Sequence, residues 1–469
     1  MSKRLLCISS GLLAPKKIDN PVARRHMYLN YGLLGLASIL EKHGYEPFVT
    51  HGRFEDPTSF VRRLNSLGLI AEDIPVLFSL PSSFAIGWAR ETMASLRSLV
   101  PDLKIIVGGR WVVADDPNWI RGMLPHASTF IEGLAEGRIV EIVGKLSNKH
   151  STDGTTSDLS PVLNYRLLED THLYQPSIEV SRGCGKGCSF CAEATVPLGA
   201  MKDPRQVADE LDGYRQLIGN TDFHAYFETS FFRPSSNWIS SFLSEMQNRS
   251  LLIPWRTESR VDAWNPKMVE QLRKTGMHVI DLGLESASPK QLLAMKKTPK
   301  PDVYLKKASE LLKACYDEGI WAKVNVLLFP GETRSTLLET TDWLNENRDF
   351  IKGLSVGPTI LYRYGQATHS VKSEFESLGA TVVEEEALDR DGYAHLHLSS
   401  EVDHDFATQF SSDLAREYMT ARDYYDLKAF SYLPRDYSWD DFKKEICRVP
   451  PDRLPFRLEG IFEIATHQN

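Results

Sequence analysis

The sequence lacks any apolar run of the roughly 20 residues that a membrane-spanning helix needs. It also lacks an excess of positive charge, because 54 Lys and Arg stand against 62 Asp and Glu and give a net charge of −8. That balance disfavours a nucleic-acid partner bound through a broad basic surface. The first residues run directly into a strand-like segment without a signal-peptide pattern, so we expect a cytoplasmic protein without a membrane segment.

Cysteine is scarce, with six in 469 residues, and half of these share one short window. Cys184, Cys188 and Cys191 have the spacing C-x₃-C-x₂-C and follow a strand-like run at residues 177–181. The other three are scattered, which is typical of isolated thiols in a reducing compartment. The clustered trio is therefore the feature most informative about function.

Three thiolates so close in sequence can meet at one metal centre, and thiolates favour iron–sulfur clusters, zinc or copper(I). Structural zinc sites and electron-transfer clusters usually take four protein ligands. A cluster held by only three cysteines keeps one iron free to bind a substrate or cofactor. A disulfide would leave one cysteine over, and a zinc site would need a distant histidine such as His172 or His224.

The segment Ser181–Cys184, with Phe190 just before the last cysteine, closely resembles the cluster loop of radical S-adenosylmethionine (radical SAM) enzymes. The resemblance implies that Cys184, Cys188 and Cys191 hold a 4Fe–4S cluster whose fourth iron chelates the amino and carboxylate groups of SAM. An electron would then cleave SAM to a 5′-deoxyadenosyl radical. The resemblance also implies an external electron donor such as flavodoxin or ferredoxin.

Residues 1–145 alternate strand and helix patterns, which predicts an α/β domain with a doubly wound parallel sheet. Strands are expected at 3–9, 45–50, 75–79 and 103–107, with helices at 31–43, 58–67 and 85–99. Ligands of such sheets bind beyond the carboxyl ends of the strands, where the loops after Ser9, Ser79 and Val107 lie. The fingerprint G-x-G-x-x-G is missing after the first strand, which disfavours NAD.

This first domain resembles the cobalamin-binding domain that precedes the barrel in a large class of radical SAM enzymes. The resemblance is carried by residues 31–40, 79–83, 106–109 and 132–137. The D-x-H-x-x-G motif of other cobalamin proteins is missing, as is common in this class.

Small residues would let a cofactor approach the backbone of this domain closely. The expected cobalamin contacts are Ser79, Ser82, Gly108 and Gly109. The same residues would equally suit tight turns between strands and helices. A domain that keeps the fold without the cofactor is therefore the alternative.

Residues 146–175 form a predicted linker, because the stretch from Ser147 to Asp158 is polar and aperiodic. Residues 176–370 alternate strands and helices again and can be matched to the partial TIM-type (β/α)₆ barrel of radical SAM enzymes. Polar residues at the carboxyl ends of barrel strands line the active face.

The resemblance assigns cofactor contacts at matching positions of this barrel. It places Phe190 against the adenine of SAM, Glu285 at its ribose or amino group, and Arg260 near its carboxylate. The stretch that ends in Pro330 and Gly331 would flank the adenine through its backbone. The structural alternatives are a surface ion pair for Arg260, a structural hydrogen bond for Glu285, and a plain turn at Pro330–Gly331.

Glu228 ends another predicted barrel strand, at a position where relatives often carry an acidic residue. It would contact SAM or the substrate. Residues 371–469 begin with an acidic, solvated stretch and continue as an aromatic-rich helical pattern. They predict a small, mostly helical domain packed on the barrel mouth, with some aromatic residues open to substrate contact.

The resemblance as a whole implies a cobalamin-dependent radical SAM methyltransferase that acts on an unactivated carbon of a small metabolite. One alternative keeps the scaffold without methyl transfer, for a rearrangement or cyclisation. Another works without cobalamin and transfers the 3-amino-3-carboxypropyl group of SAM. A non-enzymatic alternative is an iron–sulfur protein that serves in binding or sensing.

Overall fold

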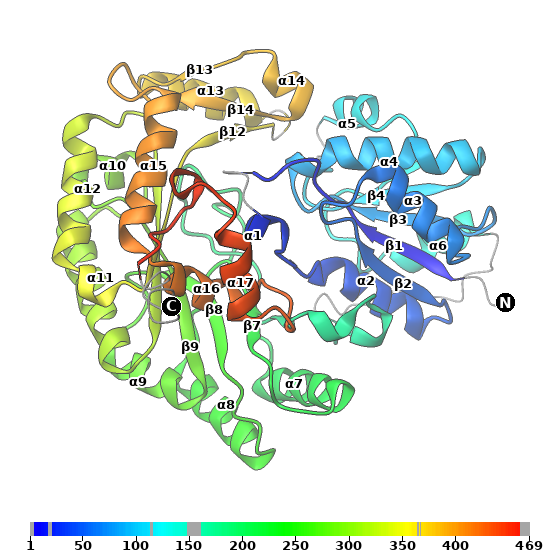
Figure 1. Cartoon of the computed structure of the whole chain (residues 1–469), viewed down its shortest axis with the longest axis horizontal. Coiled ribbons are helices and arrows are strands. Elements are labelled where there is room, and N and C mark those ends of the chain that lie inside the picture. The colour runs from blue at the N-terminus through cyan, green and yellow to red at the C-terminus, as the bar shows by residue number, and fades with distance from the viewer. Residues whose placement is uncertain are drawn as a thin grey trace, which may run out of the picture.

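The computed structural model describes residues 4–16, 21–112, 116–147, 161–363, 365 and 367–459 of the 469 residues. Two parallel sheets dominate the molecule and lie beside each other, one in the N-terminal third and one in the middle of the chain (Figure 1). The predicted fold class is confirmed by this architecture.

The first sheet has five strands, all parallel, in the order β2-β1-β3-β4-β5. Its strands are β1 (Leu5–Ser9), β2 (Pro47–His51), β3 (Val76–Ser79), β4 (Ile105–Gly108) and β5 (Thr129–Phe130). The helices of this part are α1 (Pro21–Arg24), α2 (Tyr31–Lys42), α3 (Pro57–Ser66), η1 (Ser83–Ala85), α4 (Ile86–Leu99), α5 (Pro117–Met123) and α6 (Ile139–Leu146).

Successive residues of β1 pack on opposite faces of this sheet, as the two-residue period of a strand requires. Leu5 and Cys7 belong to the same buried cluster as the apolar face of α2. Leu6 and Ile8 belong to the other buried cluster, which contains Trp88 of α4. Because both faces of the sheet are covered by helices, its strands read as continuous apolar runs.

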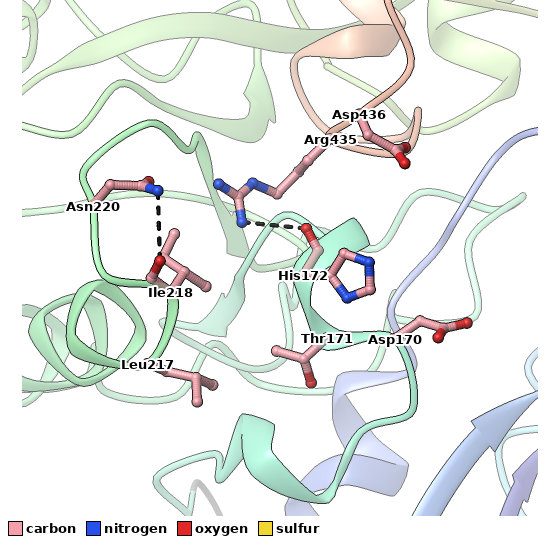
Figure 2. A pocket seen from close by; sticks show the side chains of 8 residues that line it. All are labelled: Asp170, Thr171, His172, Leu217, Ile218, Asn220, Arg435 and Asp436. Atoms are coloured by element: carbon pink, nitrogen blue, oxygen red, sulfur yellow. Dashed lines mark hydrogen bonds between the residues drawn. The ribbon is translucent and has the colours of Figure 1, made fainter.

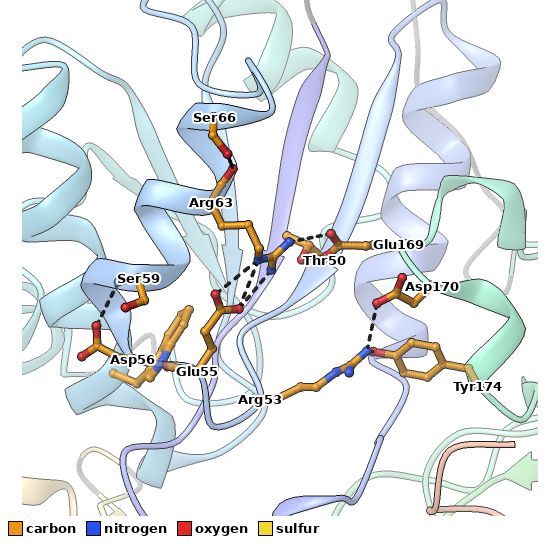
Figure 3. A network of polar contacts seen from close by, with 11 residues as sticks. Thr50, Arg53, Glu55, Asp56, Ser59, Arg63, Ser66, Glu169, Asp170 and Tyr174 are labelled. Carbon is orange, nitrogen blue, oxygen red and sulfur yellow. Dashed lines mark hydrogen bonds and ion pairs between the residues drawn. The ribbon is translucent and has the colours of Figure 1, made fainter. Parts of the chain in front are cut away.

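The second half of the predicted linker packs onto the first sheet through η2 (Tyr165–Leu167) and η3 (Thr171–Leu173). Glu169 accepts hydrogen bonds from Thr50 at the end of β2 and from Arg63 of α3 (Figure 3). Arg53 donates to the Tyr174 hydroxyl at 3.2 Å. These contacts fasten the chain to the N-terminal domain just before it enters the second sheet. The polar stretch 147–158 lies outside the described residues, except for Ser147.

The second sheet has six parallel strands in the order β11-β10-β9-β8-β7-β6. They are β6 (Ser177–Glu179), β7 (Ala225–Glu228), β8 (Trp255–Arg260), β9 (Met277–Glu285), β10 (Trp321–Leu328) and β11 (Gly353–Pro358). The intervening helices are α7 (Pro204–Ile218), α8 (Ser236–Asn248), α9 (Pro266–Lys274), α10 (Pro289–Ala294), α11 (Pro301–Asp317), α12 (Arg334–Glu346) and η4 (Arg348–Phe350). This strand order and helix alternation confirm the predicted partial barrel.

The C-terminal part is mostly helical, as predicted, but it also completes a small antiparallel sheet that the sequence did not reveal. Its strands are β12 (Ile360–Tyr362), β13 (Thr381–Val382) and β14 (Tyr393–His397), with β14 in the middle. The helices are α13 (Ala367–Ser377), α14 (Ala387–Asp391), α15 (His404–Tyr418), α16 (Ala421–Ala429), α17 (Trp439–Ile446) and η5 (Pro451–Arg453). Among the described helices, none has the length and apolarity that crossing a membrane requires.

The C-terminal helices return to the N-terminal segment around α1 (Figure 1). The backbone N–H of Met27 donates to the Tyr432 carbonyl at 2.7 Å. Arg25 forms an ion pair of 2.6 Å with Glu445 of α17. The two sheets are therefore joined by the covalent chain and also by contacts between segments far apart in sequence.

Candidate active site

The three clustered cysteines lie in a loop that follows β6 and folds back on itself. The N–H of Cys184 donates to the Val196 carbonyl at 2.9 Å. Gly183 has a φ of +75°, and a Cβ there would lie 2.1 Å from the Pro197 carbonyl oxygen. Only glycine fits such a position, so the glycine before Cys184 is required by the loop's own geometry.

The three thiols lie close enough to influence one another. Burial raises the pKa of the Cys191 thiol, and the neighbouring Cys188 and Cys184 raise it further. All three are free, and Cys188 is buried while the other two are half-buried. Within the described part of the chain, no group of three or more His, Cys, Asp or Glu could hold a single metal ion.

Arg260, at the end of β8, faces the most buried of these thiols. Its Nη1 lies 3.6 Å from the Cys188 Sγ, and its Nη2 donates to the Lys297 carbonyl at 2.8 Å. Its Nε donates to Asp262 at 2.8 Å. The guanidinium is thus held against the cysteine loop, and the predicted contact with the SAM carboxylate stays a prediction.

Glu285 ends β9 in a left-handed backbone conformation, with a φ of +69°. A non-glycine residue in this region carries strain of about 1–3 kcal/mol, and such residues cluster at functional sites. Lys297, which is only 6% exposed, donates to the Glu285 carboxylate at 3.0 Å. A Cβ at Gly283 would lie 2.6 Å from the Glu285 Oε1, so the glycine makes room for this ion pair.

Lys297 is a site residue that the sequence analysis missed. Its Nζ lies 5.8 Å from the centre of the Phe190 ring and 3.0 Å from the Glu285 carboxylate. The sequence shows only two adjacent lysines after α10, and nothing in it says which one points inward. In the structure Lys296 is exposed and pairs with Glu374, whereas Lys297 is buried beside the cysteine loop.

The remaining predicted adenine contacts lie nearby. The Phe190 ring meets the Phe329 ring edge-on, with centres 6.3 Å apart, and Phe329 directly precedes Pro330. Gly331 has a φ of +84°, and its N–H donates to the Leu398 carbonyl at 2.8 Å. Phe190 and the Pro330–Gly331 turn are therefore brought together, while their contact with adenine stays a prediction.

Below these residues, the barrel interior contains a buried network of charges. Asp281 of β9 pairs with Arg256 of β8 and with Lys323 of β10. Burial raises the pKa of the Asp281 carboxyl, but the two cations outweigh burial and hold it below its ordinary value. One carboxylate thus serves two cations, and these three side chains together carry a net positive charge.

Two other carboxyls of the interior, Glu228 and Glu258, have no cation of their own. Among the described residues, no ion pair involves either of them, and Glu258 accepts a hydrogen bond from the Tyr226 hydroxyl. Burial raises the pKa of Glu228 to about 8, and the charge of Glu258 adds to the rise. The predicted site residue Glu228 therefore belongs to an acidic pair at the carboxyl side of the barrel.

Two side chains near the barrel interior keep accessible surface although protein surrounds them. Tyr28, in the segment after α1, keeps 56% of its surface accessible although its ring lies 4.8 Å from that of Tyr432. Burial nevertheless raises the pKa of the Tyr28 hydroxyl to about 12. Glu258 is likewise accessible, and burial is the main cause of its raised pKa. Tyr28 and Glu258 therefore combine accessible surface with a dense protein environment.

At the carboxyl edge of the first sheet, one predicted cobalamin residue, Ser79, accepts a hydrogen bond within the protein. Asn30 Nδ2 donates to the hydroxyls of Ser79 and Ser9, each at 3.0 Å. The Asn30 N–H donates to the His51 Nε2 at 3.0 Å. Ser79 thus has a structural partner, which ties the ends of β1, β2 and β3 together.

Two neighbouring hydroxyls have no partner. Ser10, which follows β1, and Ser83, which follows β3, are buried, and neither Oγ has a hydrogen-bond partner among the described residues. The predicted residue Ser82 caps η1 by accepting from the Phe84 N–H at 3.4 Å. A buried hydroxyl without a partner costs about 1–3 kcal/mol, and a hydrogen bond from a polar ligand would offset that cost at either residue.

The two predicted glycines differ in their surroundings. A Cβ at Gly109, whose φ is +106°, would lie 2.8 Å from the backbone N and O of Leu80. Gly109 is therefore required by the packing of two adjacent turns. A Cβ at Gly108 would approach the Ile131 carbonyl only to 3.8 Å, an ordinary contact.

The carboxyl edges of the two sheets face each other. Arg110, after β4, forms an ion pair of 2.9 Å with Glu193 of the cysteine loop. Arg182 of that loop pairs with Glu136 of the first domain at 2.7 Å. These contacts place the cysteines opposite the loops that were predicted to bind a cofactor.

A further cavity, of about 620 Å³, lies away from this region. Its walls come from the segments that precede β6 and β7 and from the C-terminal part, and Arg435 donates there to the His172 carbonyl at 3.3 Å (Figure 2). Because the residues before a strand lie at its amino end, this cavity is on the far side of the barrel from the cysteine loop. His172 therefore does not join the cysteines.

Comparison with known families places a match in the middle of the chain. Residues 178–344 match the family model described as the radical SAM superfamily. A curated relative, an uncharacterized methyltransferase of Pyrococcus horikoshii, is 26% identical over 232 residues, which are 45% of this chain and 48% of that protein. The match thus spans about half the length of this curated relative.

Solved structures resemble most of the chain. The radical SAM methyltransferase TsrM from Kitasatospora setae, with cobalamin and a [4Fe–4S] cluster bound, matches with a TM-score of 0.60 and 17% identity over 82% of this chain and 81% of that chain. The cobalamin-dependent SAM radical enzyme OxsB, with aqua-cobalamin and SAM bound, matches with a TM-score of 0.63 and 14% identity over 90% of this chain and 67% of that chain. At this identity, the likeness is one of fold, and it extends across both sheets.

Proposed function

We propose, from the premise that residues 178–344 are a radical SAM domain, that this chain is a cobalamin-dependent radical SAM methyltransferase acting on an unactivated carbon of a small molecule. The observation that carries the proposal is the position of the cysteine loop. Cys184, Cys188 and Cys191 lie at the carboxyl edge of the barrel, and ion pairs join their loop to the carboxyl edge of the first sheet. Two cofactors bound at these edges would face each other.

The residues present suit a three-cysteine cluster with SAM beside it. Three thiolates leave one iron without a protein ligand, so a bound cluster would supply an open coordination position and a source of single electrons. Phe190 offers an aromatic face near that position. Glu285 and the buried Lys297 offer one anionic and one cationic group, which matches a ligand that carries both an amino and a carboxylate group.

The carboxyl edge of the first sheet suits a neutral, amide-rich ligand such as cobalamin. Ser10 and Ser83 offer buried hydroxyls without partners, and Gly108 leaves its backbone open to close approach. No charged side chain is needed for such contacts. The fold shared with TsrM and OxsB, both solved with cobalamin bound, supports the same assignment.

The residues around the interior would keep water away from reactive intermediates. Arg363 of the C-terminal part pairs with Asp116 of the first domain at 2.7 Å, and the Trp119 indole donates to the Asp389 carbonyl at 2.8 Å. Together with the contacts of Arg25 and Met27, these bonds close the interface on more than one side. Exclusion of water strengthens electrostatic interactions inside and prevents side reactions.

A second candidate keeps the radical SAM chemistry without cobalamin. Three of the four residues predicted to contact cobalamin have structural roles: Ser79 bonds Asn30, Ser82 caps η1, and Gly109 packs on Leu80. That pattern would also suit a first domain that serves as a scaffold. The reaction would then be a rearrangement, a cyclisation or the transfer of the 3-amino-3-carboxypropyl group of SAM.

An anaerobic reconstitution with iron, sulfide and hydroxocobalamin, followed by desalting and a metal count, tests the proposal. About four irons and one cobalt per chain are expected from the ligand set. Iron without cobalt would favour the second candidate, and release of methylthioadenosine instead of 5′-deoxyadenosine would then indicate aminocarboxypropyl transfer. Absence of iron in the wild-type protein would overturn both candidates.

The substrate and partners belong to the same proposal. We propose a small-molecule substrate, and the solved TsrM complex with tryptophan gives one example of such a substrate in a protein of similar fold. A one-electron donor such as flavodoxin or ferredoxin would reduce the cluster. A reducing cytoplasm is the compartment in which free thiols and such a cluster persist.

A further inference from the structure

Arg260 is held in one orientation beside the cysteine loop. Its Nε and Nη2 donate to the two oxygens of Asp262 at 2.8 and 3.2 Å. Its Nη2 also donates to the Lys297 carbonyl, and its guanidinium lies 5.6 Å from the centre of the Tyr304 ring. Because a guanidinium is planar and rigid, these contacts fix the direction of its remaining Nη1 group.

That remaining group points at sulfur. Arg260 Nη1 lies 3.6 Å from the Cys188 Sγ, in hydrogen-bond geometry, and Arg260 is only 8% exposed. Cys188 is the most buried of the three cysteines. The bond is therefore shielded from solvent, where a charge-assisted hydrogen bond has its largest effect.

The hydrogen bond also links the cysteine loop to the opposite wall of the site. Lys297, whose carbonyl accepts from Arg260, places its own Nζ on Glu285. The Ser189 N–H, next to Cys188, donates to the Met295 carbonyl just before this lysine. Arg260 thus occupies the junction between the cysteine loop, β8 and the segment that follows α10.

Hydrogen bonds to cluster sulfurs and the net charge nearby are two of the factors that set the reduction potential of an iron–sulfur cluster. When a [4Fe–4S]²⁺ cluster accepts one electron from a low-potential donor, it becomes [4Fe–4S]⁺, and no bond or proton need change. The added negative charge spreads onto the thiolate sulfurs. A buried guanidinium that donates to one of them stabilises the reduced form more than the oxidised form.

We propose that Arg260 is a positioning residue that donates a hydrogen bond to the Cys188 thiolate and thereby raises the reduction potential of the cluster. The proposal rests on the cluster assignment in the proposed function. It gives Arg260 a role different from the predicted contact with the SAM carboxylate. It also explains why three bonds hold a side chain that faces no open space.

A redox titration of the reconstituted full-length protein without SAM, followed by electron paramagnetic resonance, tests this role. Arg260→Gln is expected to lower the equilibrium constant for one-electron reduction about tenfold, which corresponds to a shift of about 59 mV to more negative potential. Arg260→Lys keeps the charge but loses the rigid fork of the guanidinium. The reduction potential of its cluster should therefore lie between those of the wild type and of Arg260→Gln. Lys296→Gln removes the same charge from an exposed position. It should change the equilibrium constant for one-electron reduction by less than about twofold.

The outcomes separate this inference from the proposed function. A wild-type protein that binds no iron would overturn the cluster assignment itself. A variant that retains about four irons at the wild-type potential would overturn the inference alone, as would a loss of SAM binding in Arg260→Gln without a shift in the SAM-free potential. If Arg260→Gln fails to retain iron, Arg260→Lys decides, because a wild-type potential in that variant contradicts the proposal.

Discussion

The two parallel sheets of this protein present carboxyl edges of opposite character. The barrel edge carries cysteines and charged side chains in fixed contacts, such as Arg260 on Cys188 and Lys297 on Glu285. The edge of the first sheet carries serines, glycines and one asparagine, and its unpartnered groups are the hydroxyls of Ser10 and Ser83. Both edges lie where parallel sheets bind ligands.

The difference reflects how each edge would hold its ligand. A metal cluster needs particular donor atoms, so its site leaves a pattern of residue types in the sequence. A large neutral ligand is held by shape, by backbone approach and by a few hydroxyls, and many sequences can supply these. The residues at the barrel edge were therefore predicted from a specific motif, whereas those at the edge of the first sheet were predicted from loop position and small side chains, which equally suit tight turns.

The largest effect is expected from removal of a cluster ligand. Cys188→Ala should abolish the cluster absorbance near 400 nm expected from the family resemblance, together with SAM cleavage, because two thiolates cannot hold the cluster. Anaerobic reconstitution with an iron count and analysis of SAM fragments provides the measurement. Cys447→Ala removes an exposed cysteine far along the chain and should retain full iron. Persistent SAM cleavage in Cys188→Ala would contradict the cluster assignment.

The neighbouring glycines of the first sheet offer a matched pair. Gly109→Ala should lower the free energy of unfolding by about 3 kcal/mol, because its Cβ meets the Leu80 backbone and its φ is +106°. Gly108→Ala should cost less than about 1 kcal/mol, since its Cβ would make only ordinary contacts. Urea unfolding of the apoprotein measures both. Equal losses in the two variants would show that the turn packing described here is wrong.

Titration should distinguish the charged edge from the polar one. The pKa of Glu228 is about 8 in the folded protein, against about 4.3 for an unperturbed glutamate. Between these values the folded state keeps a proton that the unfolded state has lost, so the free energy of unfolding falls as pH rises and levels off above pH 8.

Glu228→Gln removes that dependence. Relative to wild type, the variant should gain about 3–4 kcal/mol of stability between pH 5 and pH 8, as measured by urea unfolding at each pH. Glu270→Gln, at an exposed residue whose pKa is lowered by Lys274, should show no such gain over this range. If the difference in free energy of unfolding between Glu228→Gln and wild type did not change with pH, the Glu228 carboxyl would already be ionised at pH 5.

The smallest effect concerns the hydroxyl of Ser83. Ser83→Ala should leave the apoprotein as stable as wild type or slightly more stable, because the lost hydroxyl has no partner. Its affinity for cobalamin should fall about fivefold, or about 1 kcal/mol, as measured by equilibrium dialysis of cobalt. Ser411→Ala, which removes a satisfied hydroxyl on α15, should lose a little stability and leave cobalt binding unchanged. Unchanged cobalt affinity in Ser83→Ala would remove Ser83 from the candidate cofactor site.

Long apolar strands and helices with clear periodicity were predictable from the sequence, and the structure contains them within a few residues of the expected bounds. The short strands β5 and β13 were not predicted, because a strand of two residues has no detectable alternation of apolar and polar residues. Lys297 and Glu258 were not identified as site residues for another reason. Their importance arises from the direction in which each side chain points after folding, and the sequence does not show that direction.

The ion pairs between the two sheets were equally unpredictable. Arg110 meets Glu193, and Arg182 meets Glu136, only because two separately folded parts dock in one orientation. The paired residues are far apart in the sequence, and no local sequence pattern indicates that they meet. The orientation of the first domain was therefore the part of the candidate site that only the structure could supply.

The contacts between α1 and α17 have a consequence for dissecting the protein. Arg25 and Met27 bind Glu445 and Tyr432, so segments near the two ends of the described chain meet beside the interior. A cut between the two sheets would therefore yield two fragments. Each would expose the surface that contacts the other fragment in the intact protein. Such fragments should recombine into a complex when produced together, and neither should accumulate well by itself.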